Sequence, residues 1–233
     1  MLKKKISIIL STFNESAAIE KTVDEIIKYI PDVEVVIVDD DSNDGTIEIL
    51  KRLEKNNIKV FLRKKTKGLA SAFLLGLINT SGDYIGWIDS NMTKTVKMFP
   101  EMIKNLNDND IVLLSRFVMN GKDERNIVRK WSSYILNKVT KLILRSEIND
   151  LSSGIFIMKR KVLLDSLPIA SGHGEFMIEF LYKAETKGNK IKEIGYTQPI
   201  DEEGNSKSYP NLLKFLALGF FYFVRILQTL IRR

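Results

Sequence analysis

The chain has 233 residues, of which 44% are hydrophobic and 28% are charged. This length and apolar content are enough for one packed core, and they exclude an intrinsically disordered chain. The absence of cysteine excludes disulfides and thiolate-bound metals. The formal net charge of +7 favours anionic partners such as phosphates, nucleic acid or an acidic lipid surface.

The chain starts with a basic segment, residues 1–5, and a short apolar run, residues 6–10. The run is too short for the hydrophobic region of a signal peptide. We interpret it as a buried first strand, and we expect the folded domain to lie on the cytoplasmic side of a membrane.

In the first half of the chain, short apolar runs alternate with longer amphipathic segments. Continuous apolar strands separated by helices are typical of a parallel sheet that helices cover on both faces, so an α/β fold is expected. The predicted strands are residues 6–10, 33–38, 58–62, 83–88 and 111–114, and the predicted helices are residues 17–30, 46–53 and 69–78.

The second half is less regular and contains no internal repeat. It predicts helices over residues 125–144, 161–167 and 175–186, and strands over residues 154–158 and 191–197. Residues 210–233 are rich in aromatic and aliphatic side chains and contain no acidic residue, but Lys214, Arg225 and Gln228 interrupt the apolar run. This tail predicts an interfacial amphipathic helix, or the approach to a membrane span. The alternative is a helix that packs on the core of its own domain.

Polar residues follow three of the predicted strands. Residues 11–15 follow the first strand, residues 39–42 end and follow the second, and residues 89–91 follow the fourth. Ligands of parallel α/β sheets bind beyond the carboxyl ends of the strands. We therefore expect these three clusters to meet at one ligand-binding edge.

These clusters belong to a longer series of motifs. In chain order, the series is Ser-Thr-Phe-Asn-Glu (11–15), Val-Asp-Asp-Asp-Ser-Asn-Asp-Gly-Thr (38–46), Lys-Gly-Leu-Ala-Ser-Ala (67–72), Gly-Asp-Tyr-Ile (82–85), Asp-Ser-Asn (89–91), Ser-Arg-Phe (115–117), Asp-Leu-Ser-Ser-Gly (150–154) and Glu-Gly-Asn-Ser-Lys (203–207). With this order and spacing, residues 6–209 resemble the inverting family 2 glycosyltransferases, and within them the dolichol-phosphate mannose synthase group. The resemblance implies a GT-A fold with a mixed, mainly parallel sheet in residues 1–209, and a membrane-associated helix in residues 210–233.

The resemblance implies a nucleotide-sugar donor, GDP-mannose or UDP-glucose. Backbone groups near Thr12 and Phe13 would contact the base, Glu15 would bind the ribose, and Asp39 would bind the base. Asp44 and Gly45 are interpreted as a structural turn. The complete set of implied donor residues is Ser11, Thr12, Phe13, Glu15, Asp39, Asp41, Lys67, Asp89, Ser90, Asn91 and Lys207.

Lys67 and Gly68 precede a predicted helix, and a helix start beside a cation suits a diphosphate. A solvated lysine is the alternative for Lys67. Asp89 and Asn91 occupy the place of the family's Asp-x-Asp motif and are the predicted ligands of Mg²⁺ or Mn²⁺. Asn91 replaces the second acid and adds no negative charge, and Thr93 stands where the group often has glutamine or histidine, so metal dependence is open.

A lipid monophosphate acceptor is already largely ionised near neutral pH, so it needs cations rather than a general base. Arg116, Arg125, Arg129 and Lys130 are the candidate cations. We predict Asp89, Arg116 and Arg129 as catalytic, and Arg116, Arg129 and Ser206 as the acceptor-phosphate site. A solvated face, or a face lying on anionic lipid, is the alternative for the basic helix.

Several other polar residues have both a functional and a structural interpretation. Asp150 would orient an arginine or the sugar, or cap a turn, and Ser206 with Lys207 would form a lid or a linker. His173, between two glycines, predicts a loop residue. Glu175 and Glu179 predict either a substrate contact or a surface pair. Trp87, which lies within an apolar strand, is expected in the core.

Taken together, these features predict hexose transfer to a polyprenyl (dolichyl) phosphate at the cytoplasmic face of a membrane. One alternative is a family 2 enzyme that acts on a sugar hydroxyl or a protein, with Asp150 or Glu175 as the base. Another is a catalytically silent module that binds a nucleotide-sugar. Nucleic-acid binding is not expected, because no recognition motif or basic-aromatic stripe is present.

Overall fold

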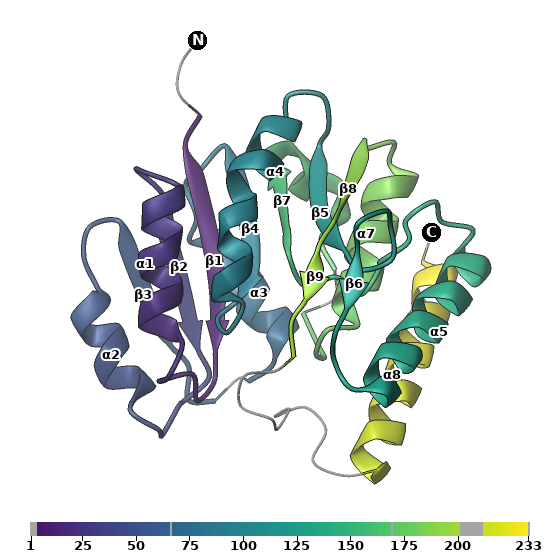
Figure 1. Ribbon diagram of the computed structural model, residues 1–233, viewed down its shortest axis with the longest axis horizontal. Helices are drawn as coiled ribbons and strands as arrows, with labels where there is room; N and C mark the ends of the chain where they lie inside the picture. Colours follow the sequence, from purple (N-terminus) through teal and green to yellow (C-terminus); the bar gives the residue numbers. More distant parts are fainter. Residues whose placement is uncertain (1–3, 66, 169, 201–211, 233) are drawn as a thin grey trace.

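A computed structural model describes residues 4–65, 67–168, 170–200 and 212–232 of the chain. A seven-stranded sheet crosses the molecule in the order β3-β2-β1-β4-β7-β5-β8, and β6 and β9 form a separate small sheet (Figure 1). The strands are β1 (Ile6–Thr12), β2 (Glu34–Asp39), β3 (Ile58–Leu62), β4 (Tyr84–Asp89), β5 (Ile111–Ser115), β6 (Lys122–Asp123), β7 (Phe156–Lys159), β8 (Ile191–Gly195) and β9 (Thr197–Gln198).

The large sheet is mixed and mainly parallel, as predicted. β1 pairs in parallel with β2 and β4, β2 pairs in parallel with β3, and β5 pairs in parallel with β8. Only β7 runs antiparallel to its neighbours β4 and β5. All six residues of β2 are buried. This burial is expected for a central parallel strand that is covered on both faces.

Helices cover the two faces of the sheet (Figure 1). The α-helices are α1 (Ile19–Tyr29), α2 (Thr46–Leu53), α3 (Leu69–Ile78), α4 (Phe99–Asn105), α5 (Ile127–Leu144), α6 (Leu163–Ser166), α7 (Phe176–Thr186) and α8 (Leu212–Ile231), with short 3-10 helices η1 (Thr93–Met98) and η2 (Arg160–Val162). One hydrophobic core lies under α1, α2, η1 and α4, and the other lies under α3, α7 and parts of α5 and α8.

Trp87 is fully buried in the second core, as predicted. Its ring packs edge-on against Phe73, with a centroid distance of 5.2 Å, and against Phe176 at 6.2 Å. These aromatic contacts join β4 to α3 and α7, and they fix the strand that ends at Asp89.

The C-terminal helix α8 packs against α7 and α5. Its buried residues are Arg225, Ile226 and Thr229, with 5%, 1% and 2% of their surface exposed. No helix in the described part of the chain is both long and apolar enough to cross a bilayer. The predicted boundary between residues 209 and 210 lies outside the described residues.

Candidate active site

The carboxyl ends of β1, β2 and β4 meet at the lower edge of the sheet in Figure 1. The strand register sets Ser11 opposite Asp89 on β4, and Thr12 opposite Asp39 on β2. The predicted meeting of the three polar clusters is therefore confirmed, and it follows from the parallel register of three adjacent strands.

Asp39 is fully buried and joins the ends of β1 and β2. Its carboxylate accepts hydrogen bonds from the Thr12 hydroxyl at 2.7 Å and the Ser42 hydroxyl at 2.5 Å, and the Ser42 amide donates to it at 2.9 Å. These bonds shape the loop after β2. The contact of Asp39 with a nucleobase stays a prediction.

Hydrogen bonds also tie the loop after β1 to the loop after β2. The Asn14 amide donates to the Ser42 hydroxyl at 2.8 Å, and the Glu15 amide donates to the Thr46 hydroxyl at 2.9 Å. Asp44 accepts from the Ser16 amide and from Thr46. Burial acts to raise the pKa of Asp44, but these hydrogen bonds outweigh it and lower the pKa to about 2. Asp44 therefore has the structural role that the sequence suggested.

Three predicted donor residues stand together at the rim of this edge. The Phe13 ring is 46% exposed. The Lys67 ammonium lies 5.6 Å from the Phe13 ring centroid and 3.3 Å from an Asp41 carboxylate oxygen. An exposed aromatic face beside a half-exposed cation can accept a planar base and an adjoining phosphate.

The start of α3 is occupied by protein groups. The Gly68 amide donates to Asp40 at 2.8 Å, and the Ala70 amide donates to the Gly172 carbonyl at 3.3 Å. The nearly buried Arg63 guanidinium binds the same Asp40 carboxylate and also the Gly68 carbonyl. These amides are therefore already satisfied, and Lys67 is the better candidate for a diphosphate contact.

Sequence reasoning missed Arg63 and Asp40. Their positions in the sequence indicated a role at this edge, because Arg63 directly follows β3 and Asp40 directly follows β2. Charged groups at the carboxyl ends of neighbouring strands face the same edge, so a pair was foreseeable.

Asp89 differs from the other carboxylates at this edge, because its side chain has no hydrogen bond or ion pair among the described residues. Burial, and to a lesser extent the nearby negative charge of Glu15, raise the pKa of Asp89 to about 6. Gly154 lies alongside, where a Cβ would stand 3.4 Å from the carboxylate. A partly buried carboxylate with space beside it suits a bound cation.

The residues around Asp89 are held by α1. The Thr22 hydroxyl of α1 donates to the Ser90 carbonyl at 2.6 Å and lies 2.5 Å from the Thr93 hydroxyl. Asn91, the next residue of the motif, has an exposed side chain. Thr93, which departs from the family pattern, therefore helps to fix the turn that presents Asp89 and Asn91.

These groups fit a divalent cation as a partial ligand set. In the described part of the chain, no three His, Cys, Asp or Glu side chains come together to hold a metal. Asp89 supplies a single carboxylate that has no cationic partner among the described residues, and Asn91 could supply an amide oxygen. Hard cations that keep few protein ligands complete their shell with substrate phosphates and water.

Arg116 lies at the end of β5, and its side chain is 6% exposed. Its Nε and Nη2 donate to the two Asp150 oxygens at 2.8 and 2.6 Å, and Nη2 also donates to Ser152 at 2.8 Å. Of the interpretations considered for Asp150, orientation of an arginine is the one that the geometry shows. The predicted contact of Arg116 with an acceptor phosphate stays a prediction.

A second arginine pair lies next to the first. Arg125 donates through Nε and Nη2 to Asp123 at 2.9 and 2.6 Å, and Asp123 lies 3.8 Å from Nη1 of Arg116. Burial acts to raise the pKa of Asp123, but Arg125 and then Arg116 outweigh it, so the pKa is lowered. Asp123 and Glu193, which binds the Asp150 amide at 3.0 Å, were not singled out from the sequence.

Arg129 and Lys130 lie in the first turn of α5, just beyond these pairs. Arg129 is partly exposed and Lys130 is exposed. Asn126 caps this turn by accepting from the Arg129 amide at 3.0 Å. The predicted acceptor and lid residues Ser206 and Lys207 lie outside the described residues.

The surface-pair interpretation of Glu175 and Glu179 is wrong, because these side chains are 4% and 1% exposed. Glu179 forms ion pairs with Arg225 at 2.7 Å and Lys183 at 2.6 Å, and Glu175 accepts from the His173 amide at 3.0 Å. His173 itself is an exposed loop residue, as predicted.

Comparison with known proteins gives the fold and the family. Residues 7–167 match the family described as Glycosyl transferase family 2. The chain is also similar to glucosyl-3-phosphoglycerate synthase from Mycobacterium tuberculosis, in a crystal structure with Mn²⁺, UDP and glucosyl-3-phosphoglycerate. That structure has a TM-score of 0.74 and 19% identity, over 97% of this chain and 80% of the other. This likeness confirms the predicted α/β GT-A-like fold.

Two relatives are similar in sequence. A dolichol-phosphate mannosyltransferase of Pyrococcus furiosus is 31% identical over 214 residues, which cover 87% of this chain and 59% of the relative. An undecaprenyl-phosphate mannosyltransferase of Micrococcus luteus is 24% identical over 213 residues, which cover 87% of each chain. The chain thus spans less than two thirds of the archaeal relative. The family match covers most of the described sheet and the edge at which Asp39, Asp89 and Arg116 lie, and the chain belongs to glycosyl transferase family 2.

Proposed function

We propose that this protein transfers a hexose from a nucleotide-sugar to a polyprenyl (dolichyl) phosphate, with inversion, at the cytoplasmic face of a membrane. The names of the two relatives support a polyprenyl-phosphate acceptor and mannose as the sugar. GDP-mannose is the first donor to test, and UDP-glucose is the second.

The observation that carries this proposal is the pairing of Asp150 with Arg116. A hydroxyl acceptor needs a general base, and Asp150 and Glu175 were the candidates. Both Asp150 oxygens already bind the Arg116 guanidinium, at 2.8 and 2.6 Å, so this carboxylate is held by the protein and is not directed at an acceptor hydroxyl. Glu175 is buried and bound to the His173 amide. An acceptor that brings its own anionic oxygen requires neither base.

The donor would lie across the edge formed by β1, β2 and β4. Phe13 and Lys67 offer a stacking surface and a cation at the rim, 5.6 Å apart. Asp39 and Asp44 hold the loops after β1 and β2 in shape through hydrogen bonds to Ser42 and Ser16. In this position the diphosphate of the donor would lie toward Asp89, the carboxylate that has no cationic partner among the described residues.

Departure of the nucleoside diphosphate builds negative charge that needs neutralisation. Asp89 and Asn91 would hold Mg²⁺ or Mn²⁺ beside the phosphates, and the ion would supply that neutralisation as a Lewis acid. The acceptor phosphate oxygen would attack the anomeric carbon in line with the leaving group. Arg129 and Lys130, on the first turn of α5, would hold that phosphate, while the Arg116–Asp150 pair ties the end of β5 to the loop between α5 and β7.

The test is transfer of radiolabelled sugar from GDP-mannose or UDP-glucose into the organic phase, with dolichyl phosphate, in the presence of Mg²⁺, Mn²⁺ or EDTA. We expect label in the lipid phase, and its loss in Asp89→Asn. Asp83→Asn is the matched control, because Asp83 adjoins the opposite end of β4 and is exposed. Absence of label with either donor, from folded protein that binds nucleotide, would overturn the proposal.

A further inference from the structure

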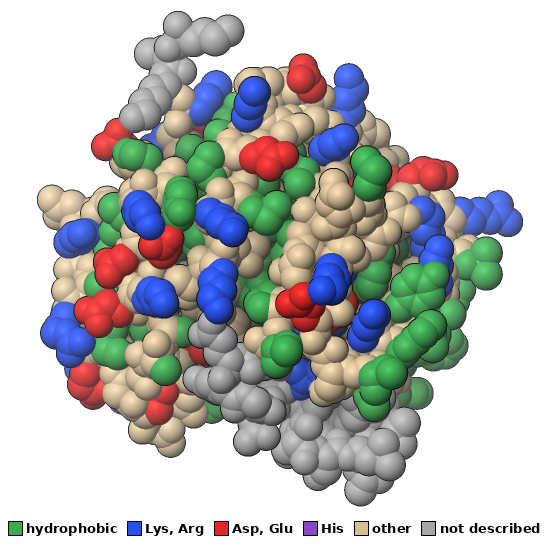
Figure 2. Space-filling model, in the orientation of Figure 1, with side chains coloured by type: hydrophobic (Ala, Val, Ile, Leu, Met, Phe, Trp, Pro, Cys, Tyr) green, Lys and Arg blue, Asp and Glu red, His purple; other side chains and the backbone are tan. Residues whose placement is uncertain are grey.

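The outer face of α5 carries an exposed row of large apolar side chains. The row begins with two adjacent residues and then continues at spacings of three and four residues, which is the spacing of a single helical face. Its members are between 42% and 80% exposed, and they are Ile127, Val128, Trp131, Ile135, Val139 and Leu142. We call them the α5 stripe. Figure 2 shows hydrophobic side chains gathered at the right-hand edge of the molecule, where α5 lies in Figure 1.

The opposite side of α5 packs against the protein, where Leu136 and Ile143 lie partly buried against the second core. Its buried residues are Asn137, Thr140 and Leu144. Asn137 donates to Ser152 at 2.8 Å and accepts from the Ser152 amide at 3.2 Å. A surface helix of a water-soluble protein normally buries its larger apolar side chains and exposes its polar ones. In α5 the six large apolar side chains of the stripe face outward, against Leu136, Ile143 and Leu144 on the packed side, which indicates that an apolar partner covers the stripe.

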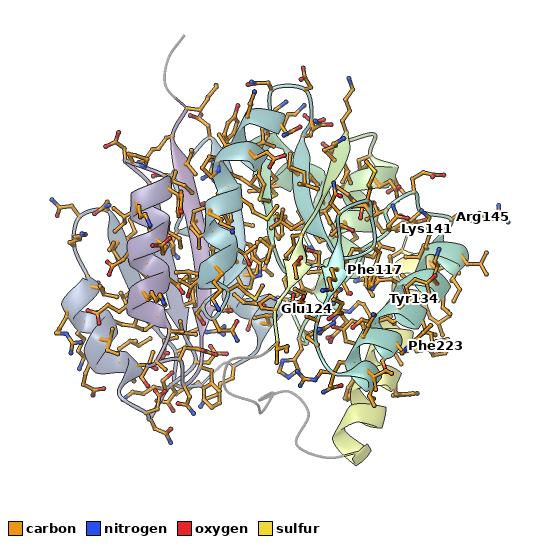
Figure 3. The ribbon with its side chains drawn as sticks, in the orientation of Figure 1. Phe117, Glu124, Tyr134, Lys141, Arg145 and Phe223 are labelled. Atoms are coloured by element: carbon orange, nitrogen blue, oxygen red, sulfur yellow. The ribbon has the colours of Figure 1, made fainter. Side chains whose placement is uncertain are left out.

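Helix α8 continues this apolar surface. It contacts α5, and its Phe220, Phe221 and Phe223 are 63%, 56% and 48% exposed. Figure 3 shows Phe223 of α8 on the same side of the molecule as Tyr134 of α5. Exposed apolar side chains on two neighbouring helices make a contiguous patch rather than isolated surface residues.

The charges around the patch identify the covering partner. Neither α5 nor α8 contains an acidic residue, and α5 contributes Arg129, Lys130, Lys138 and Lys141, followed by the exposed Arg145. In Figure 3, Lys141 and Arg145 lie at the far end of α5. Two copies that met through this patch would bring the basic side chains of α5 together, and neither α5 nor α8 has an acidic residue to pair with them. Aromatic and aliphatic side chains flanked by lysine and arginine instead match the boundary between lipid headgroups and acyl chains.

We propose that the α5 stripe, together with the exposed phenylalanines of α8, is the surface by which this protein lies on an anionic lipid bilayer. The inference deepens the proposed function, because it rests on an acceptor that is held in a membrane. Asn137 links α5 through Ser152 to Nη2 of Arg116, at 2.8 Å for each contact. These hydrogen bonds connect the docked face to Arg116 at the proposed acceptor site. Arg129 lies in the first turn of the same helix, so a phosphate at the bilayer surface would lie near it.

The first test measures binding to vesicles without nucleotide or acceptor. We expect wild-type protein to sediment with phosphatidylcholine vesicles that contain phosphatidylglycerol, and to bind pure phosphatidylcholine vesicles less. The double variant Trp131→Ser/Ile135→Ser should lose at least about tenfold in partition coefficient, because two interfacial side chains are removed. Ile78→Ser is the matched control, since Ile78 is 77% exposed on α3, far from the stripe, and it should bind as wild type.

Tryptophan fluorescence reads the depth of insertion directly. The chain has two tryptophans, and Trp87 is fully buried whereas Trp131 is 54% exposed. Lipids brominated on their acyl chains should quench wild-type emission, and Trp131→Phe should lose most of that quenching. Unquenched wild-type emission, or a double variant that binds vesicles as tightly as wild type, would overturn the inference.

Two further outcomes separate this inference from the proposed function. Sugar transfer to a short-chain, water-soluble polyprenyl phosphate without any vesicle binding would overturn the inference and leave the function intact. Vesicle binding through Trp131 without any transfer would support the inference and contradict the function. Analytical ultracentrifugation tests the alternative partner. If wild-type protein is a dimer and the double variant is a monomer, the patch binds a second copy of the chain, and the proposed contact with a bilayer is wrong.

Discussion

Arg116 and Asp150 form a buried, two-pronged ion pair between the end of β5 and the loop before β7, with N–O distances of 2.8 and 2.6 Å. The Arg116 amide donates to the same carboxylate at 3.0 Å. The pair therefore fixes both a side chain and a backbone turn beside the proposed acceptor site. Asp150 raises the pKa of Arg116 despite the opposing effect of burial, so the guanidinium stays charged.

Asp150→Asn should lower the free energy of unfolding by about 3 kcal/mol, because it leaves a buried guanidinium without its main counter-charge. Urea unfolding at pH 7.5 measures the change. The double variant Arg116→Met/Asp150→Leu should recover most of the stability, since neither charge remains, and yet stay inactive in sugar transfer. A single variant within about 0.5 kcal/mol of wild type would contradict the structural role of the pair.

Glu34→Gln should remove an acid-sensitive contribution to stability. Burial acts to raise the pKa of Glu34, but hydrogen bonds from Ser7, Lys59 and Ser81 outweigh it and lower the pKa to about 2, against an ordinary value of 4.5. A lowered folded-state pKa gives stability that is present above about pH 4.5 and is lost as the pH falls toward 2.

The variant should therefore be less stable than wild type at pH 7, by up to about 3 kcal/mol, and the two should converge near pH 2. Unfolding by urea at several pH values measures the difference. Glu25→Gln is the control, because Glu25 forms an i, i+3 pair with Lys28, which is 61% exposed. A difference for Glu34→Gln that does not change with pH would exclude the proposed linkage.

Hydrophobic periodicity predicted the sheet edge well, because each of its strands is a continuous apolar run that ends in polar residues. Helices α2 and α3 and strand β3 have the predicted bounds. The two-residue strands β6 and β9 were not predicted, since two residues carry no periodic signal. The 3-10 helix η1 and helix α4, over residues 93–105, were also missed.

Contacts between residues far apart in the chain were the other limit of the sequence. Glu179 and Arg225 are separated by 46 positions and form a buried ion pair, which a one-dimensional pattern does not show. The same holds for Arg63 with Asp40. In each case a charged residue looked like a surface group, and only the fold revealed its partner.

Arg225→Leu should loosen α8. Arg225 donates to Glu179 at 2.7 Å and to the Ser171 carbonyl at 2.7 Å, so it ties α8 to α7 and to the loop that reaches Gly172. We expect faster amide hydrogen exchange in residues 222–231 and a loss of about 2 kcal/mol, while α1 remains unchanged. Arg232→Leu, at an exposed position on the same tail, is the control and should have no effect on exchange.

Asn91→Asp should strengthen metal binding. Asn91 is exposed two residues beyond Asp89, the carboxylate whose pKa burial raises to about 6. A second carboxylate adds a negative charge within a few ångströms of the proposed ion, and an added charge at a partly solvated site is worth about 1–2 kcal/mol. The Mn²⁺ concentration for half-maximal sugar transfer should therefore fall about tenfold.

Asp89→Asn should remove Mn²⁺-dependent transfer altogether, since it deletes the sole carboxylate of the predicted pair. An unchanged Mn²⁺ requirement in Asn91→Asp, together with full activity of Asp89→Asn in EDTA, would mean that cationic side chains such as Lys67 neutralise the leaving diphosphate without a metal.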